Sequence, residues 1–253
     1  MAGRTAAREL AGVEPTRVLS DALVDALLRI TAQKRDTSRD TRTAILERLR
    51  EFGSRRYLER LRPLLRDFDP KIAEAAAGTL TSWTGETYDI EPQPLPKPPL
   101  PSVAELTAAR TLDAFLVMEN GREIQMELDV DNAPLAAVRF MRLANANYYD
   151  GLTFHRVVPN FVIQGGSPGA NEYMGDGPFM RDEISDRGHA RGTVGLSTRG
   201  RDTGDAQFFV NLVPNRRLDF EYTVFGRVVR MDVVDQIGEG DRIKDILFRR
   251  VRR

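Results

Sequence analysis

Three short runs of the sequence gather side chains that could act together on an amide group. Residues 154–166 place a guanidinium at Arg156, an amide at Gln164 and the apolar Phe161 and Val162 within nine residues. Two further runs, QFFVN and LDFEYTVFG, follow downstream. An arginine is always charged and offers a planar fork of N–H donors. Such a donor stabilises localised electron density best in dry, apolar surroundings. The runs therefore predict a site that offers a charged donor beside an apolar pocket.

In this order and at this spacing, the three runs resemble those of the cyclophilins, the barrel-shaped peptidyl-prolyl cis-trans isomerases. The resemblance extends from Leu112 to Phe248. It implies catalysis of rotation about X–Pro peptide bonds in unfolded or extended protein chains, which assists protein folding. The rotation faces a barrier of about 18–20 kcal/mol. An enzyme lowers this barrier by binding the twisted amide better than either planar form. The resemblance implies no cofactor and no metal.

The resemblance also assigns roles to individual residues. It implies that Arg156 donates to the twisted amide, with Phe161 and Gln164 beside it in the catalytic group. The residues that it assigns to substrate binding are Val162, Ser197, Thr198, Gln207, Phe209, Leu218 and Tyr222. Phe161, Phe209 and Leu218 are expected to form the apolar well for the proline ring. The two glutamines are expected to hold the substrate backbone by amide hydrogen bonds.

Each assignment has an alternative. The apolar residues of the well could be ordinary core residues, and Arg156 could pair with a carboxylate such as Glu183. His155 precedes the arginine and could be taken for an acid or base. Because the rotation moves no proton and the family uses no histidine at this place, a structural role for His155 is expected.

The chain departs from the family pattern at four positions. The family often has Asn where Thr198 stands, Gly where Asp205 stands, and Trp where Arg217 stands. Tyr222 replaces a His found in many eukaryotic members, and bacterial members commonly resemble this chain there. Asp205 is expected to add a carboxylate at the groove rim and to favour basic flanking residues. The altered rim motivates a second hypothesis, a proline-segment binding module with little turnover, although the intact Arg156 argues against it.

The composition is that of an ordinary globular chain. Its 253 residues carry no net charge, so no global field favours nucleic acid as a partner. The absence of cysteine excludes disulfides and thiol catalysis, and two isolated histidines cannot form a His/Cys zinc site. No apolar run is long enough to span a bilayer. No signal peptide is visible. A soluble, cytoplasmic protein is therefore expected by default, with export possible if the sequence begins after a leader.

Residues 91–101 contain six of the 14 prolines and predict a linker. Proline fixes φ and removes a backbone donor, which favours an extended polyproline II spacer. An SH3-type ligand is the less favoured alternative. The expected organisation is an α-helical domain over residues 1–90, the linker, and an isomerase domain over residues 102–253.

Upstream of the linker, apolar residues recur at helical spacing. The predicted helices cover residues 19–30, 44–52, 57–65 and 72–83. Asp69 and Pro70 form a start signal, Gly85 a stop signal, and Pro63 a kink. Residues 54–85 resemble a HEAT repeat, and a generic four-helix bundle is the alternative. Such a unit could be an adaptor that binds a protein partner, or even carry the main function of the chain.

Downstream of the linker, the hydrophobic period changes to two. Short alternating segments between turn residues predict strands, and Asn120-Gly121 predicts a type I′ hairpin turn. Helices are predicted from residue 134 and over residues 231–237. Pattern alone gives a β-barrel or an α+β fold. The resemblance specifies an eight-stranded antiparallel β-barrel capped by two helices.

Overall fold

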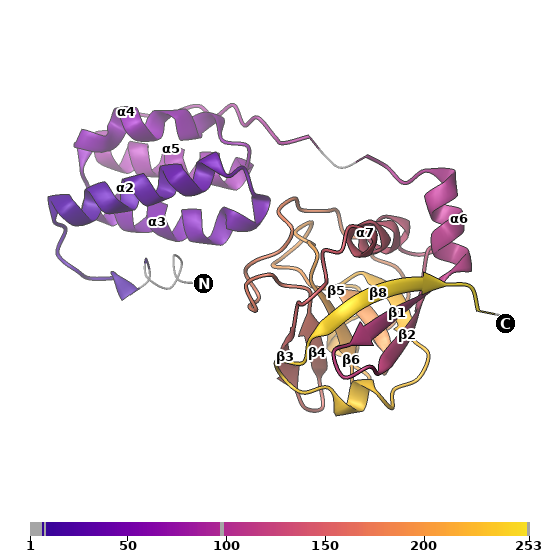
Figure 1. The fold of residues 1–253 in the computed structure, drawn as a ribbon. Coiled ribbons are helices and arrows are strands. Elements are labelled where there is room, and N and C mark those ends of the chain that lie inside the picture. Colours follow the sequence, from indigo (N-terminus) through magenta and orange to yellow (C-terminus); the bar gives the residue numbers. More distant parts are fainter. Residues whose placement is uncertain (1–6, 8, 97–98, 252–253) are drawn as a thin grey trace. The chain divides into compact units, whose positions relative to one another are not determined.

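The computed structural model describes residues 7, 9–96 and 99–251. The chain divides into two compact units, residues 1–98 and residues 99–253. Each unit has its own hydrophobic core among the described residues (Figure 1). Each unit therefore has what it needs to fold by itself.

Helices are the regular structure in the described part of the first unit, as predicted. Its 3-10 helices are labelled η. Its elements are α2 (Arg17–Ala32), η1 (Asp36–Ser38), α3 (Arg39–Phe52), η2 (Arg55–Tyr57), α4 (Leu58–Leu61), η3 (Arg62–Arg66) and α5 (Pro70–Thr84).

Local signals in the sequence set the ends of these helices. The carboxylate of Asp69 accepts from the N–H of Lys71, and Pro70 occupies the first turn of α5. Gly85 ends the same helix at a φ of +81°, which glycine adopts without steric cost. Pro63 lies where the α-helical α4 gives way to a 3-10 helix. The predicted start and stop are confirmed, and the chain changes from α-helix to 3-10 helix at the place where a kink was predicted.

A buried ion pair joins α3 to the segment before α5. Arg42 donates to both carboxylate oxygens of Asp67 at 2.8 Å, and both side chains are fully buried. The guanidinium also lies 4.3 Å from the centroid of the Phe68 ring. The pair fixes these two segments of the helical unit. The resemblance of residues 54–85 to a HEAT repeat stays a prediction.

The predicted linker has neither helix nor strand in its described part. Its first residues are held by the first unit, because the N–H groups of Glu91 and Gln93 donate to main-chain carbonyls there. At its other end, Arg142 of the second unit donates to the carbonyl of Pro99 at 2.8 Å. Residues 97–98 lie outside the described residues. Both ends of the linker are thus anchored, each to its own unit.

The second unit is a curled antiparallel sheet of eight strands with helices packed on it (Figure 1). Its strands are β1 (Asp113–Met118), β2 (Glu123–Leu128), β3 (Phe154–Val158), β4 (Val162–Gly165), β5 (Thr193–Leu196), β6 (Phe208–Asn211), β7 (Val224–Val228) and β8 (Ile243–Arg249). Its helices and turns are α6 (Val103–Thr111), α7 (Pro134–Asn145), η4 (Arg216–Leu218) and η5 (Val234–Gln236).

The strand order is β3-β4-β6-β5-β7-β2-β1-β8, so β3 and β8 form the two edges. A β-bridge between Thr153 and Arg242 joins these edges just before each strand begins. The N–H of Phe154 donates to the carbonyl of Asp241 at 2.8 Å beside that bridge. The sheet therefore closes at one end, as the predicted barrel requires.

One helix of the predicted pair is corrected by the structure. Helix α7 packs its apolar face on the barrel core, as predicted. The segment over residues 231–237 instead forms a turn and the short η5. Its buried Val234 and Ile237 still contribute to the core. The spacing of these apolar residues therefore indicated that they are buried, but not that the segment is a full helix. The second helix is α6, which packs beside α7 through the buried Ala109.

The hairpin between β1 and β2 also differs from its prediction. Type I′ turns require positive φ at both central residues. Of the Asn120-Gly121 pair, Gly121 has positive φ and Asn120 does not. The asparagine side chain instead accepts from the N–H of Arg122 at 3.0 Å. The predicted hairpin is correct and the predicted turn type is wrong.

Two further findings hold for the described ranges, from residue 7 to residue 251 with their gaps. No helix there combines the length and the apolar character that crossing a membrane requires. No group of three or more His, Cys, Asp or Glu side chains in these ranges is placed to hold a metal ion.

Candidate active site

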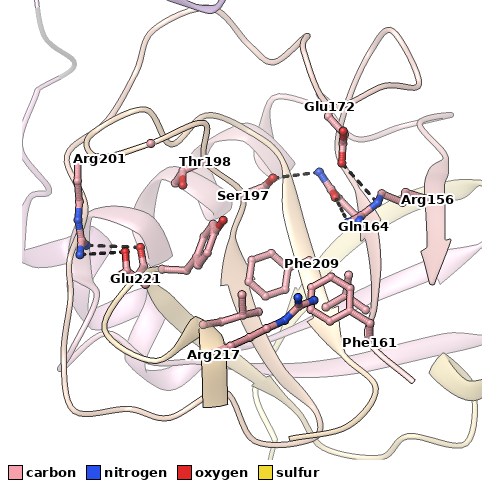
Figure 2. A pocket seen from close by; sticks show the side chains of 14 residues that line it. Arg156, Phe161, Gln164, Glu172, Ser197, Thr198, Arg201, Phe209, Arg217 and Glu221 are labelled. Atoms are coloured by element: carbon pink, nitrogen blue, oxygen red, sulfur yellow. Dashed lines mark hydrogen bonds and ion pairs between the residues drawn. The ribbon is translucent and has the colours of Figure 1, made fainter. Parts of the chain in front are cut away.

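A cavity of about 630 Å³ opens on the second unit and is lined by residues of β3, β4 and β6 and of neighbouring loops. Figure 2 shows the side chains of the 14 residues around it. The lining residues are Arg156, Phe161, Val162, Gln164, Glu172, Ser197, Thr198, Gly200, Arg201, Phe209, Arg217, Leu218, Glu221 and Tyr222. The volume falls in the range of roughly 300–1,000 Å³ that small-molecule and peptide sites occupy.

The register of the sheet builds the centre of this cavity. Arg156 on β3 pairs with Gln164 on β4, which pairs with Phe209 on β6, which pairs with Gly195 on β5. Residues that pair directly across antiparallel strands point to the same face. This row therefore sends a guanidinium, an amide and an aromatic ring to one side of the sheet.

A bulge in β3 is what brings the arginine to this face. Phe154 pairs with Gly165, and Arg156 already pairs with the next residue, Gln164, so His155 is the extra residue. In a regular strand, Phe154 and Arg156 would share one face because side chains alternate. With the bulge, Phe154 is fully buried in the core while Arg156 reaches the cavity.

Glycine at the end of the row makes room for the aromatic ring. A Cβ atom on Gly195 would lie 2.2 Å from the ring of Phe209, closer than any real contact. The ring of His189 stacks behind Phe209 with centroids 5.8 Å apart, and the ring of Tyr222 meets it edge-on at the same separation. Phe209 is therefore held rigidly as an apolar wall.

The guanidinium of Arg156 is anchored on two of its edges (Figure 2). Its Nη1 donates to Oε1 of Gln164 at 3.2 Å, and its Nε lies 3.4 Å from Oε1 of Glu172. Its Cζ lies 5.7 Å from the centroid of the Phe161 ring. The alternative pairing with Glu183 is wrong: that carboxylate accepts from two N–H groups at the start of α7.

Gln164 is held in turn by a second layer. Its Nε2 donates to Oγ of Ser197 at 3.0 Å and to Oε1 of Gln207 at 3.1 Å. With the amide nitrogen engaged there, the amide oxygen must face Arg156. Gln207 is only 1 % exposed and does not line the cavity. Gln207 contacts Gln164 instead, whereas the sequence predicted that Gln207 contacts the substrate directly.

The rim carries the charged residues Arg201 and Glu221, which the sequence did not single out, and Arg217, which the sequence marked as a departure from the family. Arg201 lies 3.2 Å from Oε2 of Glu221 and donates to the carbonyl of Phe220 at 2.9 Å. Arg217 lies over the ring of Phe161, with its Cζ 4.2 Å from the ring centroid. Figure 2 shows this guanidinium against the Phe161 ring at the apolar side of the cavity.

Loop residues of this kind carry no periodic signal. Arg201 and Glu221 were missed because they belong to two loops that only the folded chain brings together. A hint was available for Glu221, which lies inside the third motif immediately before Tyr222.

Asp205 does not lie at the rim, which corrects an expectation from the sequence. Its side chain is almost wholly buried, and its residue is 2 % exposed. Burial raises the pKa of this carboxyl above its usual range, although the nearby Arg199 acts in the opposite direction. The carboxylates at the cavity are instead Glu172 and Glu221.

Neither histidine lines the cavity. Burial lowers the pKa of both His155 and His189. Asp219 lies 3.3 Å from Nδ1 of His189 and raises that pKa in part. Both histidines thus occupy structural positions, His155 in the bulge and His189 behind Phe209.

Comparison with known proteins identifies the second unit. A family model described as cyclophilin type peptidyl-prolyl cis-trans isomerase/CLD matches residues 115–251, more than half of the chain. The chain belongs to the cyclophilin family. This cyclophilin is 37 % identical over 151 residues to a peptidyl-prolyl cis-trans isomerase of Helicobacter pylori (strain ATCC 700392 / 26695), covering 58 % of this chain and 92 % of the relative.

A second relative and a solved structure agree. Peptidyl-prolyl cis-trans isomerase B of Bacillus subtilis (strain 168) is 36 % identical over 135 residues, covering 52 % of this cyclophilin and 94 % of the relative. A crystal structure of a Cryptosporidium parvum cyclophilin type isomerase matches with a TM-score of 0.53 at 23 % identity. That match covers 56 % of this chain and 99 % of the other, and it supports the fold. This cyclophilin is a peptidyl-prolyl cis-trans isomerase.

Proposed function

We propose that the cavity binds X–Pro segments of unfolded or extended protein chains and that Arg156 is the donor that lowers the rotational barrier. The observation that carries this assignment is the anchored guanidinium beside an apolar wall. Arg156 is fixed by Gln164 and Glu172. The apolar side of the same cavity is formed by Phe161, Phe209 and the nearby Leu218.

The chemistry requires no covalent step. Rotation breaks the resonance of the X–Pro amide, which localises the lone pair on the proline nitrogen and makes it a hydrogen-bond acceptor. A guanidinium N–H aimed at that nitrogen interacts with the twisted state and not with the planar amide. Because the donor is preorganised in apolar surroundings, its contribution is larger than that of a water molecule.

The remaining lining residues suit the two other parts of the substrate. Phe161, Phe209 and Leu218 line the cavity, where they can form an apolar well for the proline ring. Ser197 and Thr198 line the cavity beside Gln164, where they can bond to the substrate backbone. In this proposal Val162 and Tyr222 complete the wall, and Gln207 acts through Gln164.

The test is cis-to-trans exchange of a short Ala-Pro peptide, measured by NMR exchange spectroscopy with the wild type and with Arg156→Ala. We expect acceleration by the wild type that falls by about 10²–10³-fold in the variant. Peptide binding by the wild type without acceleration would make the cavity a proline-recognition module. Wild-type turnover that survives in Arg156→Ala would remove the arginine from the mechanism.

The helical unit fits the role of an adaptor that presents protein clients to the isomerase unit. Its support is that each unit has its own core and that a proline-rich segment connects them. We expect the full chain and a fragment of residues 99–253 to act equally on a short peptide. On an unfolded protein, the full chain should be the faster catalyst. Equal rates on both substrates would leave the helical unit without this role.

A further inference from the structure

Asp205 is a buried carboxylate whose two oxygens contact different partners. Oδ1 accepts from the main-chain N–H of Gln207 at 2.8 Å, and Oδ2 lies 3.4 Å from Nη2 of Arg199. The loop above it approaches so closely that a Cβ atom on Gly175 would lie 2.3 Å from Oδ2. The carboxylate thus fills a tight space and contacts a different partner with each oxygen.

The first partner leads to the amide side of Arg156. Asp205 fixes the main chain at Gln207, whose Oε1 accepts from Nε2 of Gln164 at 3.1 Å. Oε1 of Gln164 then accepts from Nη1 of Arg156 at 3.2 Å. This amide arm determines where the Nη1 edge of the guanidinium lies.

The second partner leads to the carboxylate side of Arg156. Arg199, held by Asp205, donates from Nη1 to the carbonyl of Glu172 at 2.8 Å. The carboxylate of Glu172 lies 3.4 Å from Nε of Arg156, the contact drawn in Figure 2. This ionic arm determines where the Nε edge lies.

We propose that Asp205 is a positioning residue that orients the guanidinium of Arg156 through both arms at once. The proposal rests on the proposed role of Arg156 as the donor. Two fixed edges define the plane of a guanidinium and leave its Nη2 edge to donate to the substrate. Orientation of this kind matters because a displacement of about 1 Å in a reacting group can cost about a hundredfold in rate.

A purely structural role is the competing explanation, and the chain offers a matched control for it. Asp176 lies in the same loop region as Gly175 and is also nearly buried. Its carboxylate accepts from Arg139 of α7 at 2.6 Å and 2.7 Å. That ion pair holds the loop on α7, and its hydrogen bonds go to α7 and to the carbonyl of Pro178 rather than to a residue of either arm. Asp176→Asn therefore loosens the loop and removes a charge near Asp205, but it leaves the hydrogen bonds of both arms in place.

The experiment measures kcat and KM for the Ala-Pro peptide in the wild type, Asp205→Asn and Asp176→Asn. Asparagine at 205 keeps an acceptor for Gln207 but removes the charge that holds Arg199. We expect kcat of Asp205→Asn to fall about tenfold with KM within about twofold. We expect the control Asp176→Asn to stay within about twofold in both constants. An unchanged kcat in Asp205→Asn, or an equal loss in both variants, overturns the proposal.

A spectroscopic readout separates orientation from general damage. The Nε–Hε resonance of Arg156 in a ¹H–¹⁵N spectrum reports its contact with Glu172. We expect it to shift in Asp205→Asn, in Arg199→Gln and in Glu172→Gln, and not in Asp176→Asn. A resonance that moves in Glu172→Gln alone shows that the ionic arm ends at Glu172 and overturns the proposal.

Two safeguards keep the outcome decisive. If Asp205→Asn does not fold, Arg199→Gln must give the same pattern of lower kcat, unchanged KM and shifted Arg156 resonance, and its failure to do so overturns the proposal. The failures of the two hypotheses are also distinct. A wild type that does not accelerate exchange contradicts the proposed function. An active wild type whose Asp205→Asn variant keeps the same kcat contradicts only the positioning role.

Discussion

Replacing Arg156 by lysine asks whether the reaction needs the shape of the guanidinium or only its charge. The structure gives this arginine two polar contacts through different nitrogens, Nη1 to Gln164 and Nε to Glu172. A third nitrogen, Nη2, is the one that we assign to the substrate. Lysine has a single nitrogen at the end of a flexible chain, so it cannot keep both anchors and still donate to the substrate.

The magnitude follows from what each variant loses. Arg156→Ala removes the donor and its charge, which corresponds to a loss of about 10²–10³-fold in kcat. Arg156→Lys keeps the charge near the cavity but loses the fixed plane. We therefore expect a loss of at least about tenfold, and smaller than that of the alanine variant. The corresponding rise in the activation free energy is about 1.4 kcal/mol per factor of ten.

The assay is the same peptide exchange measurement, with Arg201→Lys as the control. Arg201 lines the same cavity, and its half-exposed guanidinium pairs with Glu221 at the rim. Exposed ion pairs contribute little, so the control should lose less than about threefold. A kcat of Arg156→Lys equal to that of the wild type would refute the argument, because charge alone would then suffice.

Three further predictions concern neighbouring residues. Burial lowers the pKa of His189 below its ordinary 6.5, so the unfolded chain binds this proton at a higher pH than the folded one. Relative to His189→Gln, the wild type should therefore lose free energy of unfolding as the pH falls below 6.5. Urea unfolding at several pH values measures this difference, and a difference that does not depend on pH would contradict the prediction. Arg217 places a positive charge over Phe161. Calorimetry should therefore show about threefold tighter binding of Glu-Pro than of Lys-Pro peptides, and this preference should disappear in Arg217→Gln or at high salt. Phe220 is 62 % exposed at a φ of +61°, a conformation that glycine adopts freely. Phe220→Gly should raise the free energy of unfolding by about 0.5–1 kcal/mol in urea titrations, whereas Phe220→Ala should not, and equal effects would contradict the strain argument.

Much of the fold could be predicted because the signals are local. Asp69 and Gly85 mark their helix ends through backbone groups within a few residues of themselves. The strands of the second unit follow from alternating apolar residues. The helix predicted over residues 231–237 failed because Val234 and Ile237 show the spacing of a buried helix face but belong to a single turn in the core. Periodicity detects burial, and over so short a segment it does not distinguish a helix from a turn.

The site could be predicted in part. The family resemblance assigned Arg156, Gln164 and Phe209 to one site. In the structure these residues lie in one cross-strand row. The bulge at His155 that turns Arg156 away from the core had no sequence signal. Asp205 was expected at the rim because its neighbours line a groove in the family. Its direction is set by Gln207 and other partners that only the fold supplies.

The sequence by itself determined the family, the helical and β-rich halves, and the residue types available for catalysis. These properties depend on composition, period and motif order, which are all carried by the chain in one dimension. Only the tertiary structure decided which charges face the cavity, which are buried behind it, and how the guanidinium of Arg156 is held. Those outcomes depend on strand register, one bulge and loops that meet across long sequence separations. Contacts of this kind have no local signature in the sequence, because the fold of the whole sheet determines which distant residues meet.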